Sequence, residues 1–542
     1  MALYLVNGIK VPLDFNMEHL SQPTAEVLGI DPANILTCHL LKSSIDARKK
    51  SSIVRVLQVE VELDQLLPTP LPLHVIPLEE SRHAISTPEF LTRPEPWPKE
   101  KPPVIVIGAG PAGMFAALGL AEAGIPTLLL ERGKPVDIRM RDIGQLRSKG
   151  ILDPESNVCF GEGGAGAYTD GKLYTRIKSP LVPWVMRRFV DFGAPSEILV
   201  EAHPHLGTDK LVRIVKAMRK HIEGLGAKVR FETKVDRLHL EKSRVAGVVL
   251  NSGERLEASA VILAIGHSAR DTLETLLEQG VTIHPKPFAV GVRAEHPQAM
   301  INRSQYGHAD LAKKLGAAAY QLTYQHSDSG LDQRGVYSFC MCPGGFIVPS
   351  PTEPQRMAIN GMSNANRSAP FANSGVVVQV VPEDLVRAGF AHHPLMGIAF
   401  QRSLESKSFA ATTRPYAAPA MRISDFVCRK PSGTLAPTHF RPGAEPSDLN
   451  DLLPEWLAEP LRQGLLHFDR KIRGYAGQEG NILAVESRTS SPVRLERGDD
   501  LQAVGIPGLF PVGEGAGYAG GIVSAAVDGL RAAAQLANPQ SA

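Results

Sequence analysis

The chain has 542 residues, of which 43% are hydrophobic and 21% charged, and its formal net charge is +2. These values are ordinary for a globular protein of about three domains, at roughly 100–200 residues per domain. The near-zero net charge argues against a protein held on nucleic acid or on an anionic membrane by its overall electrostatic field. The chain has five cysteines, and this odd number argues against a disulfide framework. No two of them form a Cys-x-x-Cys pair, which argues against a structural zinc site.

The N-terminal residues, MALYLVNGIKVPLDFN, lack the basic stretch and long apolar run of a signal peptide. No uncharged apolar run reaches about 18 residues, the length expected of a membrane helix. We therefore expect a soluble, cytoplasmic protein with neither a membrane nor a nucleic acid as partner, although a soluble organelle matrix stays open. The sequence leaves the oligomeric state open as well.

Residues 1–67 have the pattern of a small α/β domain. The Asn7-Gly8 pair between two short apolar runs predicts a tight hairpin turn. The alternation of Val59, Val61 and Leu63 with polar residues predicts a strand with one wet face. The basic stretch over 44–50 predicts a solvated loop or, as the alternative, a docking surface for a partner or anionic substrate. Residues 68–103 contain ten prolines and predict an extended linker on the surface.

A βαβ unit begins at Val104. The apolar run 104–107 predicts a buried parallel strand, 114–123 a helix, and 127–130 a second buried strand that ends at Glu131. A glycine turn, Gly-Ala-Gly-Pro-Ala-Gly over 108–113, joins the first strand to the helix.

That turn matches Gly-x-Gly-x-x-Gly, but so do two other segments, which begin at Gly161 and Gly515. Context decides among the three, because the fingerprint requires a strand before it and a helix after it. The second match has no clear helix after it, and only about twenty residues follow the third, too few for another strand with its own acidic residue. The first match has a strand, a helix and an acidic residue, Glu131, at the end of the next strand. It predicts a dinucleotide site, with the pyrophosphate at the helix N-terminus and Glu131 on the ribose hydroxyls. The alternative is a purely structural turn.

Further elements follow along the chain. A helix is expected over 209–223 with Thr208 as its N-cap, strands over 228–233, 244–250, 260–264 and 509–512, and a last helix over 523–536. We assign 104–270 and 505–542 to one α/β domain and 271–504 to an inserted domain of mixed α+β structure that covers the substrate.

The segment around Glu514 resembles the C-terminal flavin motif of the glutathione-reductase-type FAD superfamily. An acidic residue there ends a strand, and a glycine loop then leads into a helix. The resemblance implies that Glu514 binds the ribityl or pyrophosphate region of FAD and that the backbone of Gly521 and Ile522 faces the flavin O2. It also implies a strand-then-glycine segment near FAD at 260–267 and an adenine contact at Val235. The alternative, NAD alone, leaves the distant glycine segments unexplained.

Segments spread over nearly the whole chain are similar to a family of FAD-dependent dehydrogenases of unknown substrate. They are Ser44–Lys50, Phe160–Gly166, Tyr337–Gly345, Asn360–Ser363 and Glu486–Arg494. This resemblance implies non-covalent FAD and an oxidoreductase. It places Gly163 to Gly166 against the flavin or pyrophosphate, with Lys172 near enough to add charge, and a loop on the domain surface is the alternative. The residues expected at the cofactor are Gly108, Ala109, Gly110, Pro111, Ala112, Gly113, Glu131, Arg132, Gly163, Gly164, Ala165, Lys172, Val235, Gly266, Gly513, Glu514, Gly521 and Ile522.

Catalytic side chains are weakly marked, because a flavin carries the hydride chemistry itself. The candidates are His267, Cys340, Cys342 and Arg488, each with a structural alternative: a backbone-bound histidine, small buried packing residues and an interdomain ion pair. The two cysteines share one face of a strand, a spacing that suits a disulfide poorly. The same choice between a chemical and a structural role applies to Asn360, Ser363 and Asn364. No metal site is expected.

The leading hypothesis is an α/β, Rossmann-like FAD-dependent dehydrogenase or reductase that acts on a small organic substrate, with NAD(P)H as a transient electron donor. One alternative is a flavin monooxygenase that uses NAD(P)H and O2. Another is a flavoprotein with an RNA- or protein-binding role.

Overall fold

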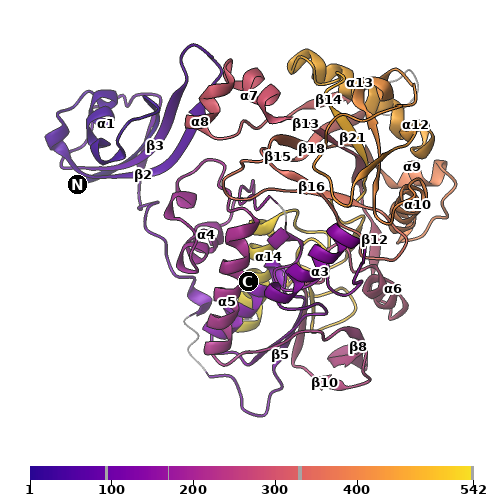
Figure 1. The fold of residues 1–542 in the computed structure, drawn as a ribbon. Coiled ribbons are helices and arrows are strands. Elements are labelled where there is room, and N and C mark those ends of the chain that lie inside the picture. Colours follow the sequence, from indigo (N-terminus) through magenta and orange to yellow (C-terminus); the bar gives the residue numbers. More distant parts are fainter. Residues whose placement is uncertain (92–95, 169, 328–332, 539–542) are drawn as a thin grey trace.

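The structure is a computed structural model that describes residues 1–91, 96–168, 170–327 and 333–538. The remaining residues, including Pro94 of the predicted linker and the last four of the chain, lie outside the described part. Figure 1 shows the N-terminal unit at one edge of the molecule, the parallel-sheet domain beside the C-terminus, and a second sheet domain on the opposite side. None of the helices within these ranges is long and apolar enough to cross a membrane.

The N-terminal unit is a four-stranded sheet of order β2-β3-β1-β4, covered by one helix. The predicted hairpin at Asn7-Gly8 is wrong, because β1 runs unbroken through it and both halves pair with β3. The register shifts between Asn7 and Ile9, and Gly8 has φ +76°. Its positive φ serves a β-bulge, which absorbs one extra residue. The elements are β1 (Ala2–Val11), α1 (Ser21–Leu28), β2 (Ile35–Asp46), β3 (Val54–Leu63) and β4 (Val75–Leu78).

The proline-rich stretch is partly built into the domains on either side of it. Strand β4 lies within the predicted linker and pairs with β1. Phe90 and Trp97 are buried in the core of the parallel-sheet domain. The basic stretch is also only partly a loop, because β2 continues to Asp46 before the exposed turn that carries Arg48 to Lys50.

The α/β domain contains a five-stranded parallel sheet of order β23-β11-β5-β6-β7, which confirms the predicted fold class. Val104 and Val106 pack against the helices on one face, and Ile105 and Ile107 pack against the three-stranded meander β10-β9-β8 on the other. Burial on both faces explains the continuous apolar run. The strands are β5 (Val104–Ile107), β6 (Thr127–Leu130), β7 (Lys228–Arg230), β8 (Val235–Glu241), β9 (Arg244–Leu250), β10 (Arg255–Glu257), β11 (Ala260–Leu263) and β23 (Leu509–Pro511).

The helices on the first face are α2 (Pro111–Glu122), α4 (Leu181–Asp191), α5 (Thr208–Gly224) and α14 (Ile522–Ala537). Helix α5 begins at Thr208 with Gly207 at the N-cap, one residue before the predicted cap. Helix α14 crosses α2 so closely that a Cβ on Gly529 would lie 2.0 Å from the Ala112 carbonyl oxygen. Both helices therefore pack on the same face of the sheet.

The second domain is built on a seven-stranded sheet of order β14-β15-β18-β13-β21-β19-β20. Its long central strands are buried along nearly their whole length, because helices cover them. The strands are β13 (Phe288–Pro297), β14 (Thr323–His326), β15 (Arg334–Cys342), β18 (Phe371–Val380), β19 (Ala418–Arg422), β20 (Ala444–Pro446) and β21 (Asn481–Glu486). Two further helices precede this sheet in the chain, α3 (Val136–Lys149) and α6 (Arg270–Glu278). The remaining α-helices and strands are β12 (Ile283–Pro285), α7 (Gln298–Tyr306), α8 (Ala312–Leu315), β16 (Phe346–Pro349), β17 (Ile359–Met362), α9 (Pro382–Arg387), α10 (Met396–Ala410), α11 (Ile423–Val427), α12 (Leu449–Leu452), α13 (Glu455–Lys471) and β22 (Val493–Leu495).

Candidate functional site

A cavity of about 390 Å³ lies where the carboxyl ends of the parallel strands meet the seven-stranded sheet domain. Open α/β sheets bind ligands at this end of their strands. Segments far apart in the sequence line it: the first glycine turn, the segments 159–166 and 170–174, the end of β11, the start of α14, and Phe339, Cys340, Asn360, Arg488 and Thr489 from the second domain.

The first glycine turn is held by contacts that exclude larger residues. Gly108 has φ +98°, and a Cβ there would lie 2.4 Å from the Ala264 carbonyl oxygen. A Cβ on Gly113 would lie 1.8 Å from the Gly108 carbonyl oxygen. Gly110 is the N-cap of α2 and offers no side chain, so no capping side chain covers this helix N-terminus, and Gly110, Pro111 and Ala112 line the cavity.

The second glycine loop lies directly on the first. The amide of Gly163 donates a 2.7 Å hydrogen bond to the Ala109 carbonyl, and a Cβ on Gly164 would lie 3.0 Å from the Gly110 Cα. Gly164 and Ala165 line the cavity, whereas Gly163, like Ala109 and Gly113, lies behind its wall. The loop is thus part of the cavity rather than a remote surface turn.

Glu131 joins the two glycine segments. One carboxylate oxygen accepts the amide of Ala109 at 2.7 Å, and the other accepts those of Gly133 and Gly161 at 2.9 Å each. Glu131 also lines the cavity, and a carboxylate has about four acceptor positions. Its contact with a ribose therefore stays a prediction, beside a backbone role that the sequence did not indicate.

Arg132 and Val235 lie at the same end of the cavity as Glu131. The guanidinium of Arg132 stacks 4.2 Å from the centre of the Phe160 ring and pairs with Asp271 at 2.8 Å. Val235 begins β8, next to Thr233 and Lys234, which also line the cavity.

The opposite end is formed by the start of α14. Gly513 and Glu514 line the cavity together with Gly521, the N-cap of α14, and Ile522, its first residue. Burial raises the pKa of Glu514 to about 8. Two helix N-termini without side-chain caps, those of α2 and α14, therefore open into one cavity, and both favour negative charge there.

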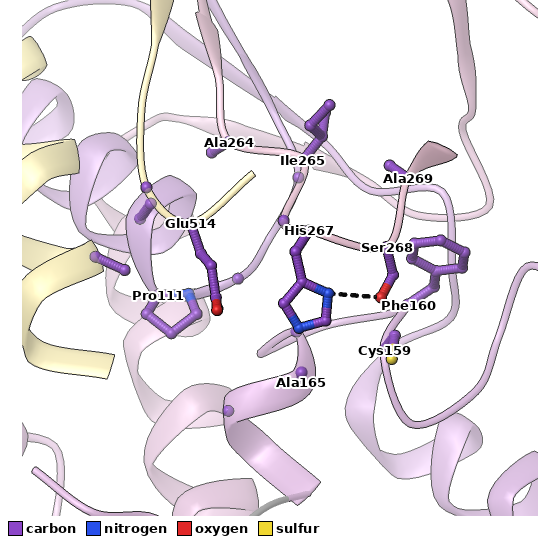
Figure 2. A pocket seen from close by; sticks show the side chains of 18 of the residues that line it. Pro111, Cys159, Phe160, Ala165, Ala264, Ile265, His267, Ser268, Ala269 and Glu514 are labelled. Atoms are coloured by element: carbon purple, nitrogen blue, oxygen red, sulfur yellow. Dashed lines mark hydrogen bonds between the residues drawn. The ribbon is translucent and has the colours of Figure 1, made fainter. Parts of the chain in front are cut away.

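His267 follows Gly266 on the loop after β11 and points into the cavity beside Glu514 (Figure 2). Its Nδ1 and the Ser268 hydroxyl are 2.8 Å apart. Burial, followed by the charges of Arg488 and Arg270, lowers the pKa of His267 to about 4. The imidazole is therefore neutral near pH 7, and its low pKa makes it a weak base, so a hydrogen-bonding role suits it better than proton abstraction.

The other candidates divide between the cavity and its surroundings. Cys340 lines the cavity and Cys342 does not. Arg488 lines it too, but its guanidinium pairs with the buried carboxylate of Glu405 at 3.0 Å and donates to the Thr352 hydroxyl at 2.7 Å. Arg488 thus makes an ion pair, as in the structural alternative that the sequence left open. This pairing leaves its guanidinium few N–H donors for a substrate.

A charged cluster beside the cavity contains Lys172 and Ser363, which the sequence marked as candidates, and Asp170 and Arg367, which it did not. Asp170, with a 1% exposed side chain, accepts hydrogen bonds from Lys172 at 2.6 Å, from Arg367 at 3.0 Å and from the Ser363 hydroxyl. Burial alone would raise the pKa of Asp170, but the Lys172 and Arg367 charges hold it well below its usual range. The one signal in the sequence was an acidic residue two positions before Lys172.

Within the described ranges, no group of three or more His, Cys, Asp or Glu side chains is placed to hold a metal ion. The residues present do fit FAD. The cavity runs from Val235 past Gly110 to Glu514 and Ile522, and it places an uncapped helix N-terminus at two separate points along its length. A cofactor with a central diphosphate and an electron-accepting ring at one end matches that arrangement.

Comparisons with known proteins agree with this assignment. Residues 287–489 match a family model described as "FAD-dependent protein, C-terminal domain-like", residues 101–145 an FAD binding domain, and residues 5–62 a domain of unknown function. An uncharacterized protein of Clostridium beijerinckii is 41% identical over 540 residues, which cover 98% of each chain.

Two further likenesses are partial or distant. The tetracenomycin B2 monooxygenase-dioxygenase of Streptomyces olivaceus is 26% identical over 206 residues, covering 33% of this chain and 36% of that protein. A geranylgeranyl bacteriochlorophyll reductase-like protein of Thermoplasma acidophilum aligns in structure with 13% identity and a TM-score of 0.31, over 80% of this chain and 77% of that one.

Proposed function

We propose that this chain, which belongs to one family with the uncharacterized Clostridium beijerinckii protein and matches two FAD-related family models, exchanges hydride between FAD and a small organic substrate. The substrate would be enclosed by the seven-stranded sheet domain. When bound, the flavin supplies the two-electron chemistry.

The observation that carries this proposal is the convergence of the α2 and α14 N-termini on one cavity. The α2 terminus suits the diphosphate, and the α14 terminus suits the negative charge that a flavin gains on reduction. Glu514, with its pKa raised to about 8 by burial, would be protonated near neutral pH and able to donate a hydrogen bond to the ribityl chain.

The substrate side of the cavity is formed by Phe339, Cys340 and Asn360. Lys172 adds positive charge there: its ammonium contacts Asp170 and the Met341 carbonyl, and an ammonium has three donors. We assign Lys172 the role of stabilising negative charge on the substrate or the reduced flavin. His267 would position the substrate as a neutral hydrogen-bonding group.

The test is anaerobic reduction of the yellow holoenzyme with NADH and with NADPH, followed by a screen for compounds that reoxidise the flavin. Lys172→Met is expected to slow flavin reduction or reoxidation at least tenfold, whereas Lys178→Met, at an exposed position in the same loop, should leave both rates unchanged. A protein that stays colourless in excess FAD, or Lys172→Met rates equal to those of the wild type, would contradict the assignment.

A monooxygenase is the second candidate, supported by the partial similarity to the Streptomyces olivaceus enzyme. It predicts oxygen-dependent consumption of NAD(P)H with a hydroxylated product. A dehydrogenase or reductase predicts turnover with an alternative electron acceptor in the absence of oxygen, so one experiment with and without oxygen distinguishes them.

A further inference from the structure

The cavity wall contributed by the seven-stranded sheet carries two cysteines at the end of β15. Cys340 lines the cavity, and Cys342 is completely buried behind it. All five cysteines of the chain are free. Cys159 also lines the cavity, but it comes from the loop beside Phe160 and has no second cysteine near it in the sequence.

The backbone between these two cysteines departs from a regular strand. Phe339 pairs with Gly375 and Cys342 with Asn373, so Cys340 and Met341 together lie opposite Ser374. This is a β-bulge, and Cys340 has φ +44°, a left-handed conformation that costs a non-glycine residue roughly 1–2 kcal/mol. Strain of this kind is found at functional sites when the surroundings hold it in place.

Two cations hold the bulge. Arg293 donates to the Cys340 carbonyl at 3.3 Å, and Lys172 donates to the Met341 carbonyl at 2.5 Å. Arg293 is itself fixed by a buried ion pair with Glu486 at 2.8 Å. In an extended strand, cysteines two positions apart point the same way and pair poorly. In this bulge the Cys342 thiol donates a 3.3 Å hydrogen bond to the Cys340 carbonyl, so the second cysteine lies against the backbone of the first.

The pKa values of the two thiols are shifted in opposite directions. The neighbouring Cys342 thiol, and then the charges of Lys172 and Arg293, lower the pKa of Cys340 despite its burial. Burial, and then the bond with Cys340, raise the pKa of Cys342 well above its usual range. A thiolate beside a protonated thiol is the state in which a dithiol exchanges with an oxidant.

We propose that Cys340 and Cys342 form a redox-active dithiol–disulfide pair that exchanges two electrons with the flavin in this cavity. The inference rests on the proposed function, because it requires FAD beside Cys340. In the reducing direction the S–S bond breaks, Cys340 leaves as a thiolate beside Lys172, and Cys342 takes up a proton. The reduced flavin supplies that proton and both electrons, and it is oxidised in the step. In the reverse direction the S–S bond forms, and the oxidised flavin takes up two electrons and one proton.

The pair would give the enzyme a second two-electron store. Cys342 is sealed from the cavity, so electrons enter and leave the pair through Cys340. This distinguishes the pair from a substrate-reducing disulfide, for which one sulfur would have to face the substrate and the other the flavin.

Reductive titration tests the proposal. Holoenzyme is oxidised with diamide, desalted and titrated anaerobically with dithionite while the flavin absorbance is followed. The wild type and Cys428→Ser, a control at an exposed cysteine, are expected to take up twice as many electrons per FAD as Cys340→Ser and Cys342→Ser. Equal uptake by all four proteins overturns the pair but leaves the proposed function standing.

Alkylation of the wild type gives a readout that depends neither on a variant nor on activity. After denaturation in iodoacetamide, the peptide carrying Cys340 and Cys342 should be unlabelled from diamide-oxidised holoenzyme and doubly labelled from the dithionite-reduced form. Double labelling in both states refutes the inference. A protein that binds no FAD refutes the proposed function and this inference together.

Discussion

The carboxylate of Glu131 accepts the amide of Ala109 at 2.7 Å through one oxygen and the amide of Gly161 at 2.9 Å through the other. One buried side chain therefore fixes the first glycine turn relative to the second glycine loop. The cofactor site depends on this relationship, because Gly110 and Gly164 face each other across it.

Glu131→Gln is expected to weaken FAD binding. Glutamine keeps one acceptor oxygen but turns an NH2 group toward an amide N–H, so at least one charge-assisted hydrogen bond, worth about 1.5–3 kcal/mol, is lost. FAD dissociation measured by fluorescence should show a Kd raised about tenfold or more. Glu241→Gln, at a 71% exposed side chain, serves as the control. Equal FAD affinity in both variants would show that the backbone contacts of Glu131 are dispensable.

Gly113→Ala tests the close packing of α2 on the parallel sheet. The new Cβ would lie 1.8 Å from the Gly108 carbonyl oxygen, so the helix or the turn must move. We expect a loss of about 1–3 kcal/mol in stability and a weaker affinity for FAD. Gly144→Ala, within α3 and with no atom within 4 Å of its Cβ, should instead stabilise by roughly 0.5–1 kcal/mol. Thermal melts of both variants, recorded with and without FAD, test this expectation. Equal melting temperatures for the two variants would contradict the close packing of α2 on the sheet.

The parallel sheet was predictable from the sequence because its signals are local. The run 104–107, the glycine turn and Glu131 lie within 30 residues, and each has its own physical reason. The start of α14 was placed by resemblance. The hairpin at Gly8 was wrong, since a glycine with positive φ suits a bulge as well as a turn, and only pairing with β3 distinguishes the two.

The clustering of charged side chains around Asp170 could not be predicted from the sequence, for a different reason. Its partners Ser363 and Arg367 are almost 200 residues away along the chain and reach Asp170 only through the fold of the second domain. The bulge that separates Cys340 from Cys342 is likewise set by Arg293 and Lys172, which come from other parts of the chain. A two-residue spacing alone predicts a shared face, which is correct only for a regular strand.

Glu514 gives the apoprotein a pH-dependent stability. Burial raises its pKa to about 8 in the folded state, from 4.5 in the unfolded chain, so the folded state binds more protons between these values. The contribution of Glu514 to stability therefore falls as the pH rises from about 5 to 8. Glu514→Gln removes this titration. The melting temperature of the wild-type apoprotein should fall relative to that of the variant over this range, and parallel curves would contradict the raised pKa.

Asp170→Asn should be the most damaging of these changes. The carboxylate is almost fully buried and accepts from Lys172, Arg367 and Ser363, so its loss leaves two cations without their partner, at a cost of about 3–5 kcal/mol. Because the folded pKa of Asp170 is depressed, its stabilising effect is present above the ordinary carboxyl pKa and is lost as the pH falls. Denaturant midpoints at pH 7 and at pH 3, below the ordinary carboxyl pKa of 3.8, should show a gap between wild type and variant that narrows in acid. Asp310→Asn, which removes an exposed ion pair with Lys313, should leave the midpoint unchanged at both pH values. A gap of constant size would mean that Asp170 acts through shape rather than charge.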